Sequence, residues 1–130
     1  MNKFKLRLNK IYNYIFKEKF YKKINIDWSN FPNRSDIIQS VIDHKDFKSY
    51  LEIGCDNDLN FNKIKIQTKL GVDPVSGGNI RKTSDEFFFE NKKKFDIVFI
   101  DGLHIYQQVK NDILNSVDCL NDNGVILVHD

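Results

Sequence analysis

Four acidic residues follow short apolar runs of this chain, at positions from which they could bind a ligand together. They are Glu52, Asp73, Asp101 and Asp130, and each stands in or directly after a run rich in β-branched, aromatic and leucine residues. Such runs, separated by polar segments of helical length, are typical of parallel strands in an α/β sheet. Ligands bind at the carboxyl ends of such strands. We therefore expect the four carboxylates to lie along one edge of a sheet and to form a site there.

The turn after the first run predicts the kind of ligand. Gly54 has no Cβ and lets the backbone approach a ligand closely. Asp73 follows Glu52 by about 20 residues, a spacing that suits an acid binding the ribose of a nucleoside. Asp56 and Asp58 stand where a dinucleotide-binding turn would have further glycines, and their charge would repel a pyrophosphate. The turn therefore favours a nucleoside cofactor with a cationic centre and no phosphates.

The elements that must position these residues follow from the spacing of apolar side chains. We expect strands over 49–53, 70–73, 95–100 and 125–129. We expect helices over 35–44, 60–66, 84–92 and 106–120, the first capped by Ser35. The last helix should be buried through Val109, Ile113, Val117 and Leu120, and 121–124 should form a turn with a positive φ at Gly124. These elements predict a three-layer α/β sandwich around a Rossmann-like, mostly parallel sheet.

The charge of the chain is unevenly distributed. Residues 1–24 hold eight Lys or Arg and one Glu, although the net charge of the 130 residues is only +2. Phe4, Leu8, Ile15 and Phe16 share one face of a helix here. We therefore divide the chain into a basic amphipathic arm with a connector, 1–33, and one domain, 34–130. We expect the arm to pack on the domain or on a second copy rather than on an anionic membrane, and we expect no nucleic-acid partner.

Two further expectations concern the cellular location of the protein and its C-terminal strand. No apolar run approaches the roughly 20 residues of a membrane span, and lysines interrupt the N-terminus where a secretory signal would be apolar. Cys55 and Cys119 make neither a disulfide framework nor a metal-binding pair, so we expect a cytoplasmic protein. The run 125–129 is typical of a buried strand but lacks cover, so we expect a sheet truncated at its C-terminus and a homodimer through this strand.

Several segments together resemble one enzyme superfamily. They are Glu52-Ile53-Gly54, Gly71-Val72-Asp73, the segment 83–88 (TSDEFF), the segment 95–104 (FDIVFIDGLH) and the segment 124–130 (GVILVHD). In this order they resemble class I S-adenosylmethionine-dependent methyltransferases, in particular the small-molecule O-methyltransferase branch with a D-G-x-H segment. The resemblance covers 35–130 and stops after the fifth of the family's seven strands.

The resemblance implies a role for each matching residue. Glu52 and Gly54 would line the methionine part of S-adenosyl-L-methionine, and Asp73 would bind its ribose. The remaining cofactor contacts would come from Thr83 and Ser84, near the adenine, and from Asp101. His104 would be the general base that activates a hydroxyl of a small methyl acceptor, such as a sugar or a secondary metabolite. In metal-dependent relatives the acids at Asp101 and Asp130 would bind a metal, with Mg²⁺ as the expected ion.

Other interpretations remain open at this stage. The chain could be a non-catalytic or decayed S-adenosylmethionine-binding fragment, or a nicotinamide or nucleotide-sugar oxidoreductase, although Asp56 and Asp58 disfavour the latter. Glu52 and Asp73 could be ordinary strand-end polar residues. Asp101 and His104 could serve only to cap the helix over 106–120.

Overall fold

The computed structural model describes residues 30–129, and the basic arm and Asp130 lie outside the described residues. The elements come in the order α2 (Arg34–Lys45), β1 (Ser49–Ile53), η2 (Phe61–Lys63), β2 (Thr68–Val72), α3 (Ser84–Glu90), β3 (Phe95–Ile100), α4 (Tyr106–Asp118) and β4 (Leu120–Val128). In this part of the chain no helix is both long enough and apolar enough to cross a membrane.

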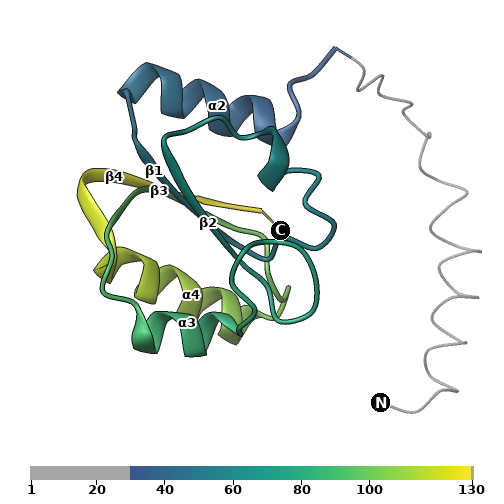
Figure 1. Cartoon of the computed structure of the whole chain (residues 1–130), viewed down its shortest axis with the longest axis vertical. Helices are drawn as coiled ribbons and strands as arrows, with labels where there is room; N and C mark the ends of the chain where they lie inside the picture. Colours follow the sequence, from purple (N-terminus) through teal and green to yellow (C-terminus); the bar gives the residue numbers. More distant parts are fainter. Residues whose placement is uncertain (1–29, 130) are drawn as a thin grey trace, which may run out of the picture. The chain divides into compact units, whose positions relative to one another are not determined.

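The described strands form one parallel sheet in the order β2-β1-β3-β4. Helix α2 covers one face of the sheet, and α3 and α4 cover the other (Figure 1). The expected three-layer α/β sandwich with a Rossmann-like sheet is therefore confirmed. In the register, Ile53 pairs with both Val72 and Ile100, and Ile100 pairs with Val128. The carboxyl ends of all four strands therefore lie along one edge.

Both faces of the central strands are buried. On the α2 side the core contains Ile38, Ile42, Tyr50, Ile97 and Phe99. On the other side it contains Leu51, Ile53, Phe87, Val98 and Ile100. Successive side chains of a strand point to opposite faces, so Glu52 lies on the α2 side with Tyr50. This alternation decides which cavity Glu52 reaches.

The first residues of α2 and α3 are fixed by side-chain caps. Asn33, not the expected Ser35, caps α2, because its Oδ1 accepts from the backbone N–H of Asp36 while the Asp36 carboxylate accepts from the backbone N–H of Asn33. Thr83 and Glu86 form the same reciprocal pair at α3. Each such capping box supplies partners for backbone donors that the first helical turn leaves free.

The face that α4 turns inward agrees only in part with the expected one, since Ile113 packs against the core as expected. Asp112 and Ser116 are buried, whereas Val117 is 55% exposed. Leu120 belongs to β4, because the helix ends at Asp118. The inward face therefore includes Ile113 of the apolar stripe together with a small serine and a hydrogen-bonded carboxylate that the stripe does not contain.

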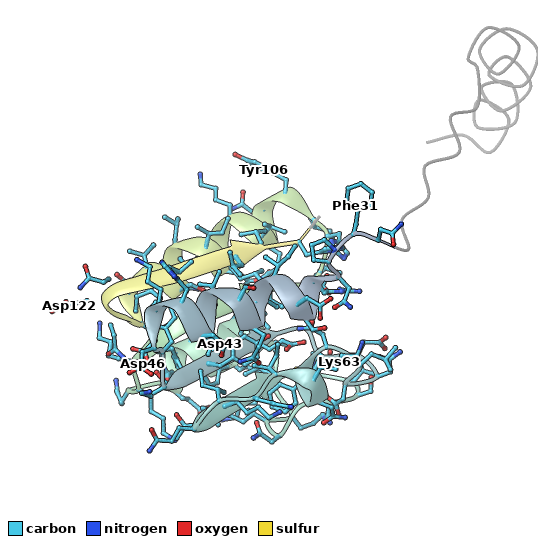
Figure 2. All side chains as sticks on the ribbon, turned by 90° about the horizontal axis from the view of Figure 1, so that it is seen from above. Phe31, Asp43, Asp46, Lys63, Tyr106 and Asp122 are labelled. Carbon is cyan, nitrogen blue, oxygen red and sulfur yellow. The ribbon has the colours of Figure 1, made fainter. Side chains whose placement is uncertain are left out.

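Strand β4 begins earlier than expected and contains the predicted turn as an irregularity. The pairing with β3 jumps from Phe95–Leu120 to Ile97–Val125, so extra residues of β4 bulge out between these pairs. The positive φ, 64°, occurs at Asn123 rather than at Gly124. Asp122 lies at the start of the strand, where the chain turns back (Figure 2). β4 is an edge strand among the described residues; its apolar residues 125–127 are only partly buried, and Val128 is exposed.

Candidate functional site

A cleft of about 750 Å³ lies at the carboxyl edge of the sheet. It is lined by loops that follow β1, β2 and β3, by the first residues of α3 and by α4. Most of the residues predicted from the sequence line this one cleft: Gly54, Asp73, Thr83, Ser84, Asp101 and His104. The parallel register brings them together, because it aligns the ends of strands that are far apart in the chain.

Most of the exposed lining of the cleft is apolar, and most of its charged side chains are acidic. Its carboxylates come from Asp56, Asp73, Asp85, Asp101 and Asp112, and Arg34 is the arginine that lines it. Ile53, Val72, Val75 and Leu103 add apolar surface. A cavity walled by charges of one sign attracts ligands of the opposite sign. The cleft therefore suits a ligand that combines an apolar group with a cationic centre.

Asp73 organises the floor of the cleft. Its Oδ2 accepts from the backbone N–H groups of Cys55 and Asp56, each at 3.0 Å, and its Oδ1 accepts from those of Val75 and Ser76, each at 2.8 Å. Burial raises the pKa of this carboxyl, but the four backbone donors outweigh burial and hold the pKa below its ordinary value. Asp73 is therefore ionised at neutral pH and ties the turns after β1 and β2 together.

Gly54 is required by a contact within the chain. Its φ is +84°, and a Cβ built on it would lie 2.3 Å from the carbonyl oxygen of Asp101 and 2.6 Å from Cα of Gly102. The sequence pattern assigns this glycine to the close approach of a ligand. The structure adds that the backbone after β3 already occupies the space that a side chain would need.

The turn after Gly54 keeps a glycine-like backbone although it carries aspartates. Asp56 and Asp58 have φ values of 47° and 63°, in the left-handed region that Asp and Asn tolerate better than most residues. Asp58 Oδ1 accepts from the backbone N–H of Gly78 at 2.6 Å, whereas Asp56 is exposed and lines the cleft. Asp58 is thus a structural link between loops, and Asp56 is the one of the two that can face a ligand.

Glu52 does not line the main cleft. It lies in a second hollow of about 330 Å³ on the α2 side, which shares Arg34, Gly54, Asp56 and Asp101 with the cleft. Its Oε2 accepts from the Tyr50 hydroxyl and from Asn60 Nδ2. Burial raises the pKa of Glu52 to about 7, although both hydrogen bonds act in the opposite direction. Glu52 is therefore an acid whose charge is costly at neutral pH.

Asp101 is the centre of a cluster at the mouth of the cleft, here called the Asp101 cluster: Asp101, His104 and His129. His129 Nδ1 lies 3.1 Å and His104 Nε2 lies 3.6 Å from Asp101 Oδ1. Arg34, from the first turn of α2, forms an ion pair with the other oxygen, Oδ2. A backbone hydrogen bond of 2.9 Å from His129 to Ile100 sets the ends of β3 and β4 side by side. Asp130, the other predicted metal ligand, lies outside the described residues.

The far wall of the cleft is a hydrogen-bonded polar group. Gln108 Nε2 donates to Ser84 Oγ at 3.1 Å and to Oδ1 of both Asp85 and Asp112 at 3.0 Å. Burial raises the pKa of Asp112, and the hydrogen bonds from Ser84 and Gln108 partly oppose that rise. The Thr83 hydroxyl donates to Glu86 as part of the cap of α3. Ser84 and its neighbours therefore face the cleft with donors and acceptors that a heterocyclic ring could use.

Sequence reasoning missed four residues of the site: Arg34, Gln108, Asp112 and His129. Arg34 stands in the first helix, far from every motif. Gln108 and Asp112 lie in α4, where an amphipathic pattern directed attention to apolar positions. His129 carried a usable signal, because it directly follows a strand parallel to β3 and strand ends meet at one edge of the sheet.

Comparison with known proteins identifies the class. A profile of a methyltransferase domain family matches residues 32–130. The chain belongs to this methyltransferase domain family. Searches of curated proteins and of solved structures gave no match. The matched span contains the whole sheet, the cleft and the Asp101 cluster, so the family assignment and the geometry concern the same part of the chain.

Proposed function

We propose that this methyltransferase uses S-adenosyl-L-methionine and methylates a hydroxyl of a small molecule. The observation that carries the proposal is the cleft at the carboxyl edge of the sheet, which combines a largely apolar lining with several carboxylates. S-adenosylmethionine bears a sulfonium, an ammonium and an adenine ring, which match the five carboxylates and the apolar part of the lining. The phosphates of a nicotinamide dinucleotide would meet the same carboxylates unfavourably, so the oxidoreductase alternative receives no support from the cleft.

In this proposal different lining residues bind different parts of the cofactor. Ser84 and the polar group around Gln108 would bind the adenine, and Asp73 the ribose. Gly54 and Asp101, at the junction of the cleft with the second hollow, would lie along the methionine part, with Glu52 behind them. When bound, the cofactor supplies a methyl group that an acceptor oxygen can attack in line, so holding the two reactants in position is the main task of the protein.

The proton of the acceptor hydroxyl would leave through the Asp101 cluster. His104 is 52% exposed at the mouth of the cleft, where an acceptor can reach it, and Asp101 lies beside its Nε2. A carboxylate next to an imidazole stabilises the imidazolium that forms when the ring takes a proton. Mg²⁺ prefers oxygen ligands, and the described neighbours of Asp101 are imidazoles and a guanidinium. We therefore include no step through Mg²⁺.

Calorimetric titration tests the cofactor directly. We expect S-adenosylhomocysteine to bind the full chain and NADH to bind more weakly or not at all. Tighter binding of NADH would overturn the proposal. Binding of S-adenosylhomocysteine without methyl transfer to any of a panel of hydroxyl compounds, with amine and thiol acceptors as further arms, would favour the non-catalytic alternative.

The ribose contact of Asp73 is tested by Asp73→Asn. The loss of a charge-assisted hydrogen bond, worth about 1.5–3 kcal/mol, should weaken binding of S-adenosylhomocysteine about 10- to 100-fold. Asp96→Asn is the matched control, because Asp96 also accepts from two backbone N–H groups, those of Lys48 and Ser49. Asp96 lies near the start of β3, at the edge of the sheet opposite to the cleft. Both variants should lose stability and only Asp73→Asn should lose affinity. Equal affinity in the two variants would refute the ribose assignment.

The charge of Asp56 is tested by comparing two ligands. Asp56→Asn keeps a residue that tolerates positive φ and removes one carboxylate from the cleft. Because the side chain is exposed, we expect only a two- to fivefold loss of affinity, about 0.4–1 kcal/mol. The loss should be larger for S-adenosylmethionine, which carries the sulfonium charge, than for S-adenosylhomocysteine. Asp122→Asn, at the start of β4, should change neither affinity, and an equal loss for both ligands would contradict a cationic centre near Asp56.

A further inference from the structure

One amide holds together the far wall of the cleft. Four side chains form this wall, here called the Gln108 group: Ser84, Asp85, Gln108 and Asp112. The first two begin α3, the other two lie one turn apart in α4, and the two helices are in contact on the same face of the sheet (Figure 1). All four side chains line the cleft. A contact between two helices therefore forms part of the proposed cofactor site.

The contacts of Gln108 fix the direction of its amide. Nε2 lies 3.0 Å from Oδ1 of both Asp85 and Asp112, and 3.1 Å from Ser84 Oγ. A carboxylate oxygen accepts hydrogen bonds and does not donate them, so the nitrogen end of the amide has to face the two acids. Because one nitrogen contacts three oxygens, Gln108 holds Ser84 and Asp85 of α3 against Asp112 of α4.

Asp112 anchors the group from inside the domain. The residue is only 1% exposed, and it accepts hydrogen bonds from Ser84 and Gln108. A Cβ on Gly102 would lie 3.9 Å from Asp112 Oδ2, so the acid also packs against the loop that follows β3. Hydrogen-bonded polar networks of this kind make their surroundings rigid. The positions of Ser84 and Asp85 at the cleft are therefore set by a buried residue of another helix.

The Gln108 group offers a ligand acceptors rather than side-chain donors. The two hydrogens of Gln108 Nε2 are shared among three oxygens, and the Ser84 hydroxyl donates to Asp112. The hydroxyl of the preceding residue, Thr83, donates to Glu86. Asp85 is exposed, uses Oδ1 for Gln108 and has a second carboxylate oxygen for a ligand. The edge of a ring that meets this wall must therefore donate hydrogens.

We propose that the Gln108 group selects a cofactor with a 6-aminopurine ring, with Ser84 and Asp85 in contact with the amino group and with Gln108 and Asp112 as positioning residues. The 6-amino group of adenine donates two hydrogens, whereas the 6-oxo group of hypoxanthine would present an acceptor to oxygens that cannot donate. A site built to hydrogen-bond an N–H rejects the analogue that lacks it, because the polar groups of the site are left unpaired. The inference rests on the proposed function and adds to it two residues of α4.

S-inosylhomocysteine tests the selection, because it carries a 6-oxo group in place of the 6-amino group of S-adenosylhomocysteine. In calorimetric titrations of the full chain, we expect S-adenosylhomocysteine to bind at least about tenfold more tightly. Equal affinities, or tighter binding of S-inosylhomocysteine, would overturn this inference and leave the proposed function standing. Absence of binding by either compound would overturn both.

The positioning role is tested by Gln108→Met, which keeps the length and the helix propensity of the side chain and removes the amide. The preference for S-adenosylhomocysteine should fall about three- to tenfold. Gln107→Met is the matched control, because Gln107 Nε2 also donates to the residue four positions on, Asn111, at 3.1 Å, but Gln107 is not among the residues that line the cleft. Only Gln108→Met should change the preference. Equal preferences in the two variants would reduce Gln108 to a structural role and refute the assignment.

The contact with the amino group is tested by Asp85→Asn, at an exposed position where the variant should fold even if Gln108→Met does not. Because Gln108 Nε2 needs an acceptor, the new amide should keep its oxygen toward Gln108 and turn its nitrogen, a donor, toward the ligand. The preference should then shift toward S-inosylhomocysteine by about three- to tenfold. Asp118→Asn, an exposed acid at the end of α4, is the control and should leave the preference unchanged. An unchanged preference in Asp85→Asn would refute the contact of Asp85 with the amino group.

Discussion

Replacing Gly54 with alanine is expected to lower the free energy of unfolding by about 2–5 kcal/mol. The left-handed backbone contributes about 1–2 kcal/mol of this loss. Overpacking adds about 1–3 kcal/mol, because the new Cβ would lie 2.3 Å from a backbone oxygen of Asp101 and neither backbone is free to move. Small domains have about 5–15 kcal/mol of stability in total. Urea unfolding followed by far-ultraviolet circular dichroism measures the loss.

Gly102→Ala is the matched control for this prediction. Gly102 belongs to the segment that faces Gly54, but a Cβ on it would meet Ile53 Cγ2 at 3.5 Å, an ordinary van der Waals distance. We expect this variant to lie within about 1 kcal/mol of the wild-type chain. Equal stabilities of Gly54→Ala and Gly102→Ala would show that the turn after β1 does not pack against the loop after β3 as described.

The approximate positions of the strands were within reach of the sequence because their signals are local. Each of β1, β2 and β3 is a short apolar run bounded by polar residues, and parallel pairing then places the residues after the strands at one edge. The meeting of Gly54, Asp73 and Asp101 in the cleft follows from that single geometric fact. This is why the sequence alone assigns Asp73 and Asp101, far apart in the chain, to one site.

What the sequence could not supply depends on contacts between distant segments. Asp112 lies on the inward face of α4 with a hydrogen bond to Ser84 of α3, and no periodicity of apolar residues encodes this contact. Asn33 rather than Ser35 caps α2, because the side chain of Asp36 forms a reciprocal pair with Asn33. Arg34 enters the site only because that cap fixes where α2 begins.

The cavity that Glu52 reaches is also something that the sequence motif did not predict. Alternation along β1 places its side chain on the α2 face, so it belongs to the second hollow and not to the cleft that Gly54 and Asp73 share. The sequence motif joins Glu52 to Gly54, whereas the pleat of the strand separates their surroundings. Glu52 can therefore influence a cofactor in the main cleft only from the second hollow, which meets the cleft at Gly54 and Asp101.

Replacing Glu52 with glutamine is expected to stabilise the chain at pH 8 and to change its stability little at pH 5. The pKa of Glu52 is raised by burial from 4.5 to about 7 in the folded chain. The folded state therefore holds a proton that the unfolded state releases, and the stability contributed by the protonated acid is lost as the pH rises from about 4.5 to about 7. A pKa difference of one between the folded and unfolded states corresponds to about 1.4 kcal/mol, so the full loss is about 3 kcal/mol.

The measurement is the free energy of unfolding of both chains between pH 5 and pH 8. The two curves should separate as the pH rises, with the glutamine chain above, and should run parallel beyond pH 7. Tyr50→Phe provides a second test, because the Tyr50 hydroxyl lowers the pKa of Glu52 by donating to it. Its removal should move the separation to higher pH. Parallel curves across the whole range would show that the charge of Glu52 does not destabilise the fold.

A buried acid that reduces stability at neutral pH persists in a fold most readily when its charge is used. Glu52 lies behind Gly54 and Asp101, where the proposed cofactor would bring the ammonium of its methionine part. A cation there would favour the ionised acid and lower its pKa. We therefore expect Glu52→Gln to bind S-adenosylhomocysteine more weakly at pH 8 even as it unfolds less readily. Stronger binding together with greater stability would assign Glu52 to the core alone.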